Sequence, residues 1–599
     1  SCAGRMNSSN IELAVTSPFS ESWGQYQLHP EDLPWRKASE GRLCGKWIRA
    51  LWGNELYQER RSSSTGRSDD MVTMLSLTLP PALDITKFFE LFKLSCMHAR
   101  FIHPILAVTI ETNVLQIPLM PCLVYEEVHT FEQVQSWSDT VMFIHRCETD
   151  EERAQSREER LEFMRNKIGL RPLPLTQRVK EWHWVLFGRA EDQSHVALFV
   201  YSAHAVSDAH SELILMKEQL EYVTSAFEAP FPLPETHSLH PATLAWGTEV
   251  TRLTPSLFEL VGVPLDSFSD ETALRRIRRV LAHPFLRLDL GRPKDGSNLT
   301  DTLHDRIQFT AEETAAIHKA ARAHGWSVTH IVDAARHMAY MELRRSYLES
   351  WHWNPIPEKL HVNFLVPANA RCLISESYKH LQQTFVGNAT EGFTTVLPLM
   401  DPYFVSAQDE LMTSEKPLHE LSQVRTLAYV TQKLAEQYYE EKPLGMERIV
   451  SETPTFVMAG VFSPLYPFDN LAPEGFSSVG AIDTLLPCNF HMPSYTEPIT
   501  VDDWGVGVIM SRHLSSLQFS MHMWTFRQQL NLSVVHTPHI SNARTELFLD
   551  TIHRTLKLFL MAFEQHGKPI DIPSSPPTPF VSRTLFQRAI SWCQSWFTN

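Results

Sequence analysis

Residues 195–210, HVALFVYSAHAVSDAH, carry the pattern from which the fold of this chain can be predicted. HVALFVY is almost entirely apolar, which is typical of a strand whose two faces are both buried. Asp208 precedes apolar residues at helical spacing, so we expect it to be the N-cap of a helix over about 209–227, with Leu213, Leu215, Leu220 and Val223 on its buried side. His204 is therefore predicted to lie in a short loop between a buried strand and a helix.

A histidine in such a loop suits the activation of a hydroxyl group. An alcohol is a poor nucleophile until a base removes its proton, and the ordinary pKa of imidazole lies close to neutral pH. In the transfer of an acyl group from a thioester to an alcohol, the imidazolium formed in this way can then protonate the departing thiolate. Such a transfer requires no acyl-enzyme. This chemistry makes His204 a candidate general base. Asp208 would hold the loop through a salt bridge or a capping hydrogen bond.

The same residues have other interpretations. A histidine at a strand end is more often a satisfied core residue, and an aspartate before an apolar helix is most often only an N-cap. His204, Asp208 and His210 are also the residue types that bind a metal, although His210 on the helix need not converge with His204. About one H-x-x-x-D is expected by chance among 28 histidines, and the chain has one. Its position between strand and helix favours the functional interpretation.

The bulk composition bounds the class of protein. A length of 599 residues predicts two domains, and 43% hydrophobic with 20% charged residues predicts a globular chain. The net charge of −16 argues against nucleic-acid binding. The eight cysteines are scattered without a CxxC pair, which favours a reduced, intracellular protein. No run of 18 apolar residues and no signal-peptide pattern is found, so we expect a cytoplasmic protein, with a monomer as the default.

Other apolar runs predict further elements. Strands are expected at 182–187, joined as a hairpin to 195–201, and at 72–77. Asp84 is a predicted N-cap, and Thr310 with Glu313 forms a predicted capping box that opens a second half. Further strands and helices are expected at 362–366, 505–510, 530–535, 327–345 and 542–564. These elements predict an α/β fold with mixed sheets.

Composition places the predicted boundaries. Residues 284–305 contain Pro and Gly among polar residues, and residues 148–168 are dense in charge, typical of a solvated helix or an insertion. The tail ends in an apolar segment that either docks on the body or forms a membrane-interface or partner-binding helix. We therefore predict an N-terminal extension, an N-terminal subdomain, a crossover linker, a C-terminal subdomain and a tail, at 1–71, 72–283, 284–305, 306–565 and 566–599.

Other catalytic motifs are absent from the sequence. There is no GxGxxG, no P-loop and no HExxH. The segment GFSSVG, residues 475–480, is one residue longer than the G-x-S-x-G of a nucleophile elbow, and no strand clearly precedes it. We interpret this segment as a loop.

Seven segments follow one another along the chain: HPIL (103–106), AHAVSDA (203–209), FTAEETAAIHKAARAHGWSVTHIVDAA (309–335), NARCL (369–373), FVGNAT (385–390), VDDWGVGV (501–508) and WTFRQQLNLSVVH (524–536). In this order they resemble the HxxxD acyltransferase superfamily, which includes chloramphenicol acetyltransferase, the BAHD enzymes and peptide-synthetase condensation domains. The set covers roughly residues 72–565 and is more specific than HxxxD alone. With LAWGTEV (244–250), it looks most like fungal secondary-metabolite O-acetyltransferases such as the trichothecene 15-O-acetyltransferase group.

The resemblance implies two chloramphenicol-acetyltransferase-like domains that meet along an interface channel. His204 would be the catalytic base at its middle, and Asp208 a structural residue paired with Arg371. Asp503, Trp504 and Gly505 would be structural or donor-side residues. The sequence departs from the family at Ala209, where glycine is common, and VDDWGVGV matches the family's DFGWG only loosely.

The resemblance also implies an acyl-CoA co-substrate and no permanently bound cofactor. Guanidinium groups suit the phosphates of CoA, and Arg275 and Arg276, with Arg278 and Arg279, are candidates, although a solvated helix face is the commoner explanation. The leading hypothesis is transfer of an acyl group, expected to be acetyl, to a hydroxyl of a terpenoid or polyketide. Transfer from a carrier-protein thioester to an alcohol or amine, and a non-catalytic binding protein of the same fold, are the alternatives.

Overall fold

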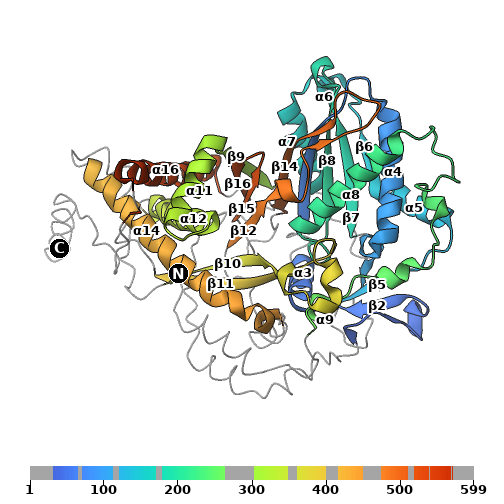
Figure 1. Ribbon diagram of the computed structural model, residues 1–599, viewed down its shortest axis with the longest axis horizontal. Helices are drawn as coiled ribbons and strands as arrows, with labels where there is room; N and C mark the ends of the chain where they lie inside the picture. Colours follow the sequence, from blue (N-terminus) through green and yellow to red (C-terminus); the bar gives the residue numbers. More distant parts are fainter. Residues whose placement is uncertain are drawn as a thin grey trace, which may run out of the picture.

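The computed structural model describes residues 32–64, 70–111, 121–169, 179–262, 302–348, 361–398, 416–449, 474–509, 519–537, 540–567 and 569–570. Three sheets and the helices packed on them make up this part of the chain (Figure 1). Two of the sheets contain both parallel and antiparallel pairs, which confirms the mixed α/β class.

The N-terminal sheet contains the predicted buried strand at its centre. Its order is β13-β14-β3-β8-β7-β6. Its strands are β3 (Met71–Thr78), β6 (Met142–His145), β7 (Lys180–Leu186), β8 (His195–Ser202), β13 (Asn489–Phe490) and β14 (Ile499–Val508). Helices α4 (Ile85–Ile102) and α8 (Ala209–Phe227) share one apolar core with this sheet. Asp84 caps α4 and Asp208 caps α8, so both predicted N-caps are confirmed.

The C-terminal sheet has the order β11-β10-β12-β15-β16-β9. Its strands are β9 (Leu303–Gln308), β10 (His361–Asn369), β11 (Thr390–Pro398), β12 (Glu474–Ala481), β15 (Phe519–Phe526) and β16 (Gln529–His536). Helices on one side of it supply its core (Figure 1), namely α11 (Ala311–Ala323), α12 (Val328–Leu348), α14 (Lys416–Glu441) and α16 (Asn542–His566). The predicted capping box of Thr310 and Glu313 is present at α11.

The third sheet is small, with the order β1-β2-β5-β4. Its strands are β1 (Arg36–Lys37), β2 (Trp47–Ala50), β4 (Thr109–Glu111) and β5 (Cys122–Tyr125). Helix α3 (Gly53–Ser64) follows β2, and Leu51 and Leu56 lie in the core of the N-terminal sheet. Residues 36–64, which composition assigned to an extension, are therefore packed on the body, because their apolar residues are buried there.

Strand β14 connects the two large sheets. It comes from the predicted C-terminal subdomain, yet it pairs antiparallel with β3 of the N-terminal sheet. Trp504 of β14 packs edge-on against Trp524 of β15, with ring centroids 5.5 Å apart. The proposed subdomain boundaries remain a prediction, and each half contributes strands that contact the other.

One local prediction was wrong, and another was confirmed in part. Residues 475–480 form most of β12 and not a loop, because the segment pairs with β10 on one side and β15 on the other, and Phe476 is buried in the C-terminal core. The charged stretch 148–168 forms α6 (Asp150–Ala154) and α7 (Arg157–Gly169), and Met164 and Ile168 are buried against the N-terminal sheet. Most of the predicted linker, the tail after 570, Arg275, Arg276, Arg278 and Arg279 lie outside the described residues.

Candidate active site

His204 lies in the loop between β8 and α8, where the amide of Val206 donates to the carbonyl of Ala203 and forms a tight turn. The half-buried imidazole has its Nδ1 atom 3.0 Å from the carbonyl oxygen of Ser207. A carbonyl oxygen can only accept a hydrogen bond, so Nδ1 carries the proton. The Nε2 atom of neutral His204 therefore keeps a lone pair that can take a proton from a substrate.

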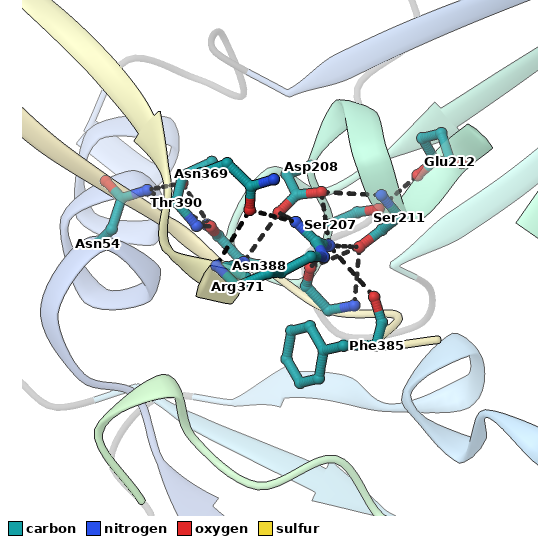
Figure 2. Close-up of polar contacts among 12 residues, drawn as sticks. Asn54, Ser207, Asp208, Ser211, Glu212, Asn369, Arg371, Phe385, Asn388 and Thr390 are labelled. Atoms are coloured by element: carbon teal, nitrogen blue, oxygen red, sulfur yellow. Dashed lines mark hydrogen bonds and ion pairs between the residues drawn. The ribbon is translucent and has the colours of Figure 1, made fainter. Parts of the chain in front are cut away.

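Asp208 does not contact the imidazole through its carboxylate but holds the loop from the other side. The carboxylate accepts from the backbone amides of Ser211 and Ala389, each at 2.8 Å. It also accepts from both terminal nitrogens of Arg371, each at 2.9 Å (Figure 2). Four charge-assisted donors thus fix the carboxylate of a residue that is 2% exposed.

The charge of Asp208 is stabilised despite its burial. Burial alone would raise the pKa of this carboxyl, but the adjacent Arg371 guanidinium outweighs burial and lowers the pKa to about 2. Asp208 is therefore ionised at neutral pH and does not exchange protons during a reaction. Its geometry fits a structural role.

Arg371 reaches Asp208 from the C-terminal half, where it lies in a short 3-10 turn directly after β10. The side chain of Asn369 accepts from the backbone amide of Arg371 at 3.0 Å and caps this turn. The guanidinium also donates to the Ser211 hydroxyl at 2.7 Å and to the carbonyl of Phe385 at 3.1 Å. A single buried side chain thus ties α8 to the other half of the protein, as Figure 2 shows.

The segment 385–390, FVGNAT, also contacts this loop. The Asn388 side-chain amide donates to the carbonyl of His204 at 2.8 Å. The Gly387 amide donates to the Ser211 hydroxyl at 2.9 Å. A Cβ atom on Gly387 would lie 2.8 Å from the Phe385 ring and 3.1 Å from Thr254, so only glycine fits this close approach.

A second buried ion pair contacts the loop from within the N-terminal half. The Lys180 ammonium lies 2.5 Å from Oε1 of Glu212, and both side chains are at most 2% exposed. The hydroxyls of Ser202 and Ser207 donate to the same carboxylate oxygen. Ser207 is the residue whose carbonyl accepts from His204, so this pair and the Asp208–Arg371 pair hold the loop from opposite sides. Motif spacing does not indicate this second pair, because Lys180 lies just before the strand predicted at 182–187 and is the first residue of β7.

The predicted donor-side residues of β14 are engaged within the protein. Asp503 forms a two-pronged ion pair with Arg306 of β9 at 2.6 and 2.8 Å. Trp504 is fully buried in the N-terminal core. Gly505 pairs with Met74 of β3, and the space above its Cα is open. The structure brings His204, Asp208 and Arg371 together, whereas Arg275 and Arg276 lie outside the described residues.

Two further observations bear on the alternatives. The described residues contain no group of three or more His, Cys, Asp and Glu arranged to hold a metal ion. His210, the third residue of the metal hypothesis, is half-buried on the first turn of α8. Within the same part of the chain, no helix is long and apolar enough to cross a membrane.

Comparison with known proteins identifies the fold. No protein-family model and no curated protein matches the sequence. A trichothecene 15-O-acetyltransferase from Fusarium sporotrichioides matches with a TM-score of 0.71 at 17% identity, over 89% of this chain and 98% of that one. The epimerization domain from the third module of tyrocidine synthetase B matches with a TM-score of 0.54 at 12% identity, over 89% of this chain and 100% of that one.

The first condensation domain of the calcium-dependent antibiotic synthetase matches with a TM-score of 0.51 at 12% identity, over 86% of this chain and 95% of that one. These solved structures resemble the chain along nearly all of their own length, so the likeness concerns the whole architecture and not one sheet. The order of motifs predicted such an architecture. The chain therefore has a fold of the BAHD and condensation-domain type, with two chloramphenicol-acetyltransferase-like halves.

Proposed function

We propose that this protein is an O-acyltransferase that moves an acyl group, acetyl in the first instance, from CoA to a hydroxyl of a terpenoid or polyketide. The observation that carries the proposal is the tautomer of the His204 imidazole and the fixed position of its loop. Its Nδ1–H is committed to the Ser207 carbonyl, so Nε2 is available as a base, and a buried ion pair immobilises the loop. A general base held in one tautomer is what transfer to an alcohol requires.

The proposed reaction needs no covalent enzyme intermediate. Nε2 of His204 removes the hydroxyl proton while the hydroxyl oxygen bonds to the thioester carbonyl carbon. The tetrahedral intermediate then expels the thiolate, which takes the proton back from the imidazolium of His204. The products are an ester and free CoA thiol, and His204 returns to its neutral form. Asp208 and Arg371 keep the loop in place and exchange no proton.

Donor binding is the less constrained part of the proposal. The β14 residues Asp503, Trp504 and Gly505 would shape the wall beside the donor, and Arg275 and Arg276 would meet its phosphates. The likeness to an O-acetyltransferase along nearly its full length supports CoA as donor and a fungal secondary metabolite as acceptor. The expected working form is a cytoplasmic monomer.

A second candidate function is transfer from a carrier-protein thioester to an alcohol or amine. The resemblance to a condensation domain favours it. It keeps His204 as base and changes only the donor. Activity with purified acetyl-CoA and no carrier protein would count against this alternative, and a protein of this fold without catalysis would be inactive with either donor.

A thiol-release assay tests the proposal. The wild type is incubated with acetyl-CoA and hydroxylated fungal metabolites, including a trichothecene with a free 15-hydroxyl, and acceptor-dependent CoA release is measured. His204→Ala should lose about 10²- to 10⁴-fold of the rate, the contribution of a general base. His210→Gln removes the imidazole on the first turn of α8 and should stay within about threefold of wild type. An active His204→Ala would refute the assignment of the base.

A further inference from the structure

One face of the C-terminal sheet is turned toward the N-terminal half. Along β15, Met521 and Met523 lie in the core formed with the helices. The residues between and beside them face the opposite way, because side chains alternate along a strand. Trp524 on that second face belongs to the core of the N-terminal half and packs on Trp504. Ser520 and His522 share this face with Trp524.

A polar row crosses this face. His522 of β15 pairs in register with Ser477 of β12 on one side and with Ser533 of β16 on the other. Ser533 pairs in turn with Arg306 of β9. Sheet faces covered by protein are normally apolar, and a polar group there is costly unless it finds a hydrogen bond. The Ser533 hydroxyl lies 2.7 Å from Nε2 of His304, and the Arg306 guanidinium donates to the Asp503 carboxylate. These two members of the row therefore have hydrogen-bond partners.

His522 differs from these two members of the row. Its side chain is 5% exposed, and Nδ1 has no hydrogen-bond partner in the described part of the chain. Burial, together with the electrostatic effect of a charge on His204 as the second cause, lowers the pKa of His522 to about 4. His522 is therefore neutral near pH 7 and lies within electrostatic reach of His204. A buried imidazole nitrogen without a hydrogen-bond partner is uncommon in proteins, and here a bound substrate could supply the missing acceptor.

We propose that His522 is a second catalytic histidine, whose neutral Nδ1–H donates a hydrogen bond to the carbonyl oxygen of the acyl group as it is transferred. The inference rests on the proposed acyl transfer and assigns a residue outside the HxxxD motif. The bond is made to the oxygen only, and the proton stays on His522 throughout.

The chemistry explains why this histidine should be uncharged. When the hydroxyl attacks, the carbonyl electron pair moves onto oxygen while His204 becomes a cation. A second cation beside His204 would oppose that step, whereas a neutral imidazole can stabilise the oxyanion without such repulsion. The buried setting strengthens this hydrogen bond, because a fixed donor in a site shielded from water does not have to reorganise.

Three substitutions test the assignment in the thiol-release assay. His522→Phe should lower kcat by about 10²-fold, the loss typical of one oxyanion donor, with the KM for acetyl-CoA within about twofold of wild type. His522→Asn places an amide where Nδ1 was and should recover at least about tenfold of that loss. Ser520→Ala, a matched change on the same face of β15, should leave kcat within about threefold of wild type.

The outcomes separate the two proposals. A wild type that releases no thiol with any acceptor contradicts the proposed function and this inference with it. An active wild type with a fully active His522→Phe overturns the role of His522 alone, as does a variant in which only the acceptor KM changes. If His522→Phe does not fold, His522→Gln replaces it, since Gln mimics Nε2, and activity equal in the Asn and Gln variants would also overturn the assignment.

Discussion

The Asp208 carboxylate and the Arg371 guanidinium, 163 positions apart in the chain, face each other with both N···O distances at 2.9 Å. Each residue is at most 5% exposed. A buried ion pair contributes little net stability over an apolar pair of the same shape, but it is costly to break from one side. Its geometry makes it a device for position, because it aligns a loop of one half against a strand end of the other.

Removal of one partner should therefore destabilise the protein strongly. We expect Arg371→Met to lower the free energy of unfolding by about 3–5 kcal/mol, because the Asp208 charge stays buried without its counter-ion. Chemical denaturation of wild type and variant measures the difference. Lys379→Met, which breaks the exposed pair with Glu376, should change little. Equal losses in the two variants would contradict the assigned role of the buried pair.

The pH dependence of stability should carry the signature of Asp208. Its folded pKa, about 2, lies below the ordinary value of 3.8. A carboxyl with a depressed folded pKa adds stability above its unfolded pKa and loses it as the pH falls through the folded pKa. The contribution should be constant above about pH 5 and decline between about pH 4 and 2. Denaturation of wild type and Asp208→Asn should show their difference shrinking in that window, and a difference that is flat from pH 5 to 2 would contradict it.

Elements that a short segment of the sequence determines could be predicted, whereas elements that depend on distant parts of the chain could not. The loop between β8 and α8 could be predicted, since an apolar strand, a polar break and an N-cap follow one another within the segment 195–210. Strand β12 could not, because GFSSVG has turn residues and gains its strand form only from neighbours on both sides. The hairpin of β15 and β16 turns at Arg527 and Gln528, both at positive φ, without the Asn-Gly that signals such a turn.

The residues of the candidate active site also differ in how far they could be predicted from the sequence. The pairing of Asp208 with Arg371 was accessible only through a family resemblance, since the two residues lie in different halves. The Lys180–Glu212 pair and the position of His522 depend on strand register, which short-range patterns do not encode. The unpredicted part of the site is thus the part made by tertiary packing.

Gly387 offers a test of how tightly the 385–390 segment fits. A Cβ atom there would lie 2.8 Å from the Phe385 ring, and overpacking of this kind costs about 1–3 kcal/mol. Gly387→Ala should lower the melting temperature and reduce kcat, since the adjacent Asn388 holds the His204 carbonyl. The double variant Gly387→Ala with Phe385→Leu should regain part of both losses. A double variant no better than the single one would show that the ring contact is not the cause.

Variants of Ser202 and Ser207 can separate the effect of His204 orientation on catalysis from the effect of the Glu212 hydrogen bonds on protein stability. Ser202 and Ser207 both donate to Oε1 of Glu212, but only Ser207 presents its carbonyl to Nδ1 of His204. Each alanine substitution removes one hydrogen bond to the same carboxylate, so both should cost a similar 0.5–3 kcal/mol, roughly, of unfolding free energy.

Only Ser207→Ala should also disturb catalysis, because the carbonyl that fixes the tautomer of His204 loses its anchor. We expect kcat to fall roughly tenfold in Ser207→Ala and to stay within about threefold of wild type in Ser202→Ala, the KM for acetyl-CoA being unchanged in both. Equal kinetic effects in the two variants would mean that Glu212 supports the fold without orienting the base.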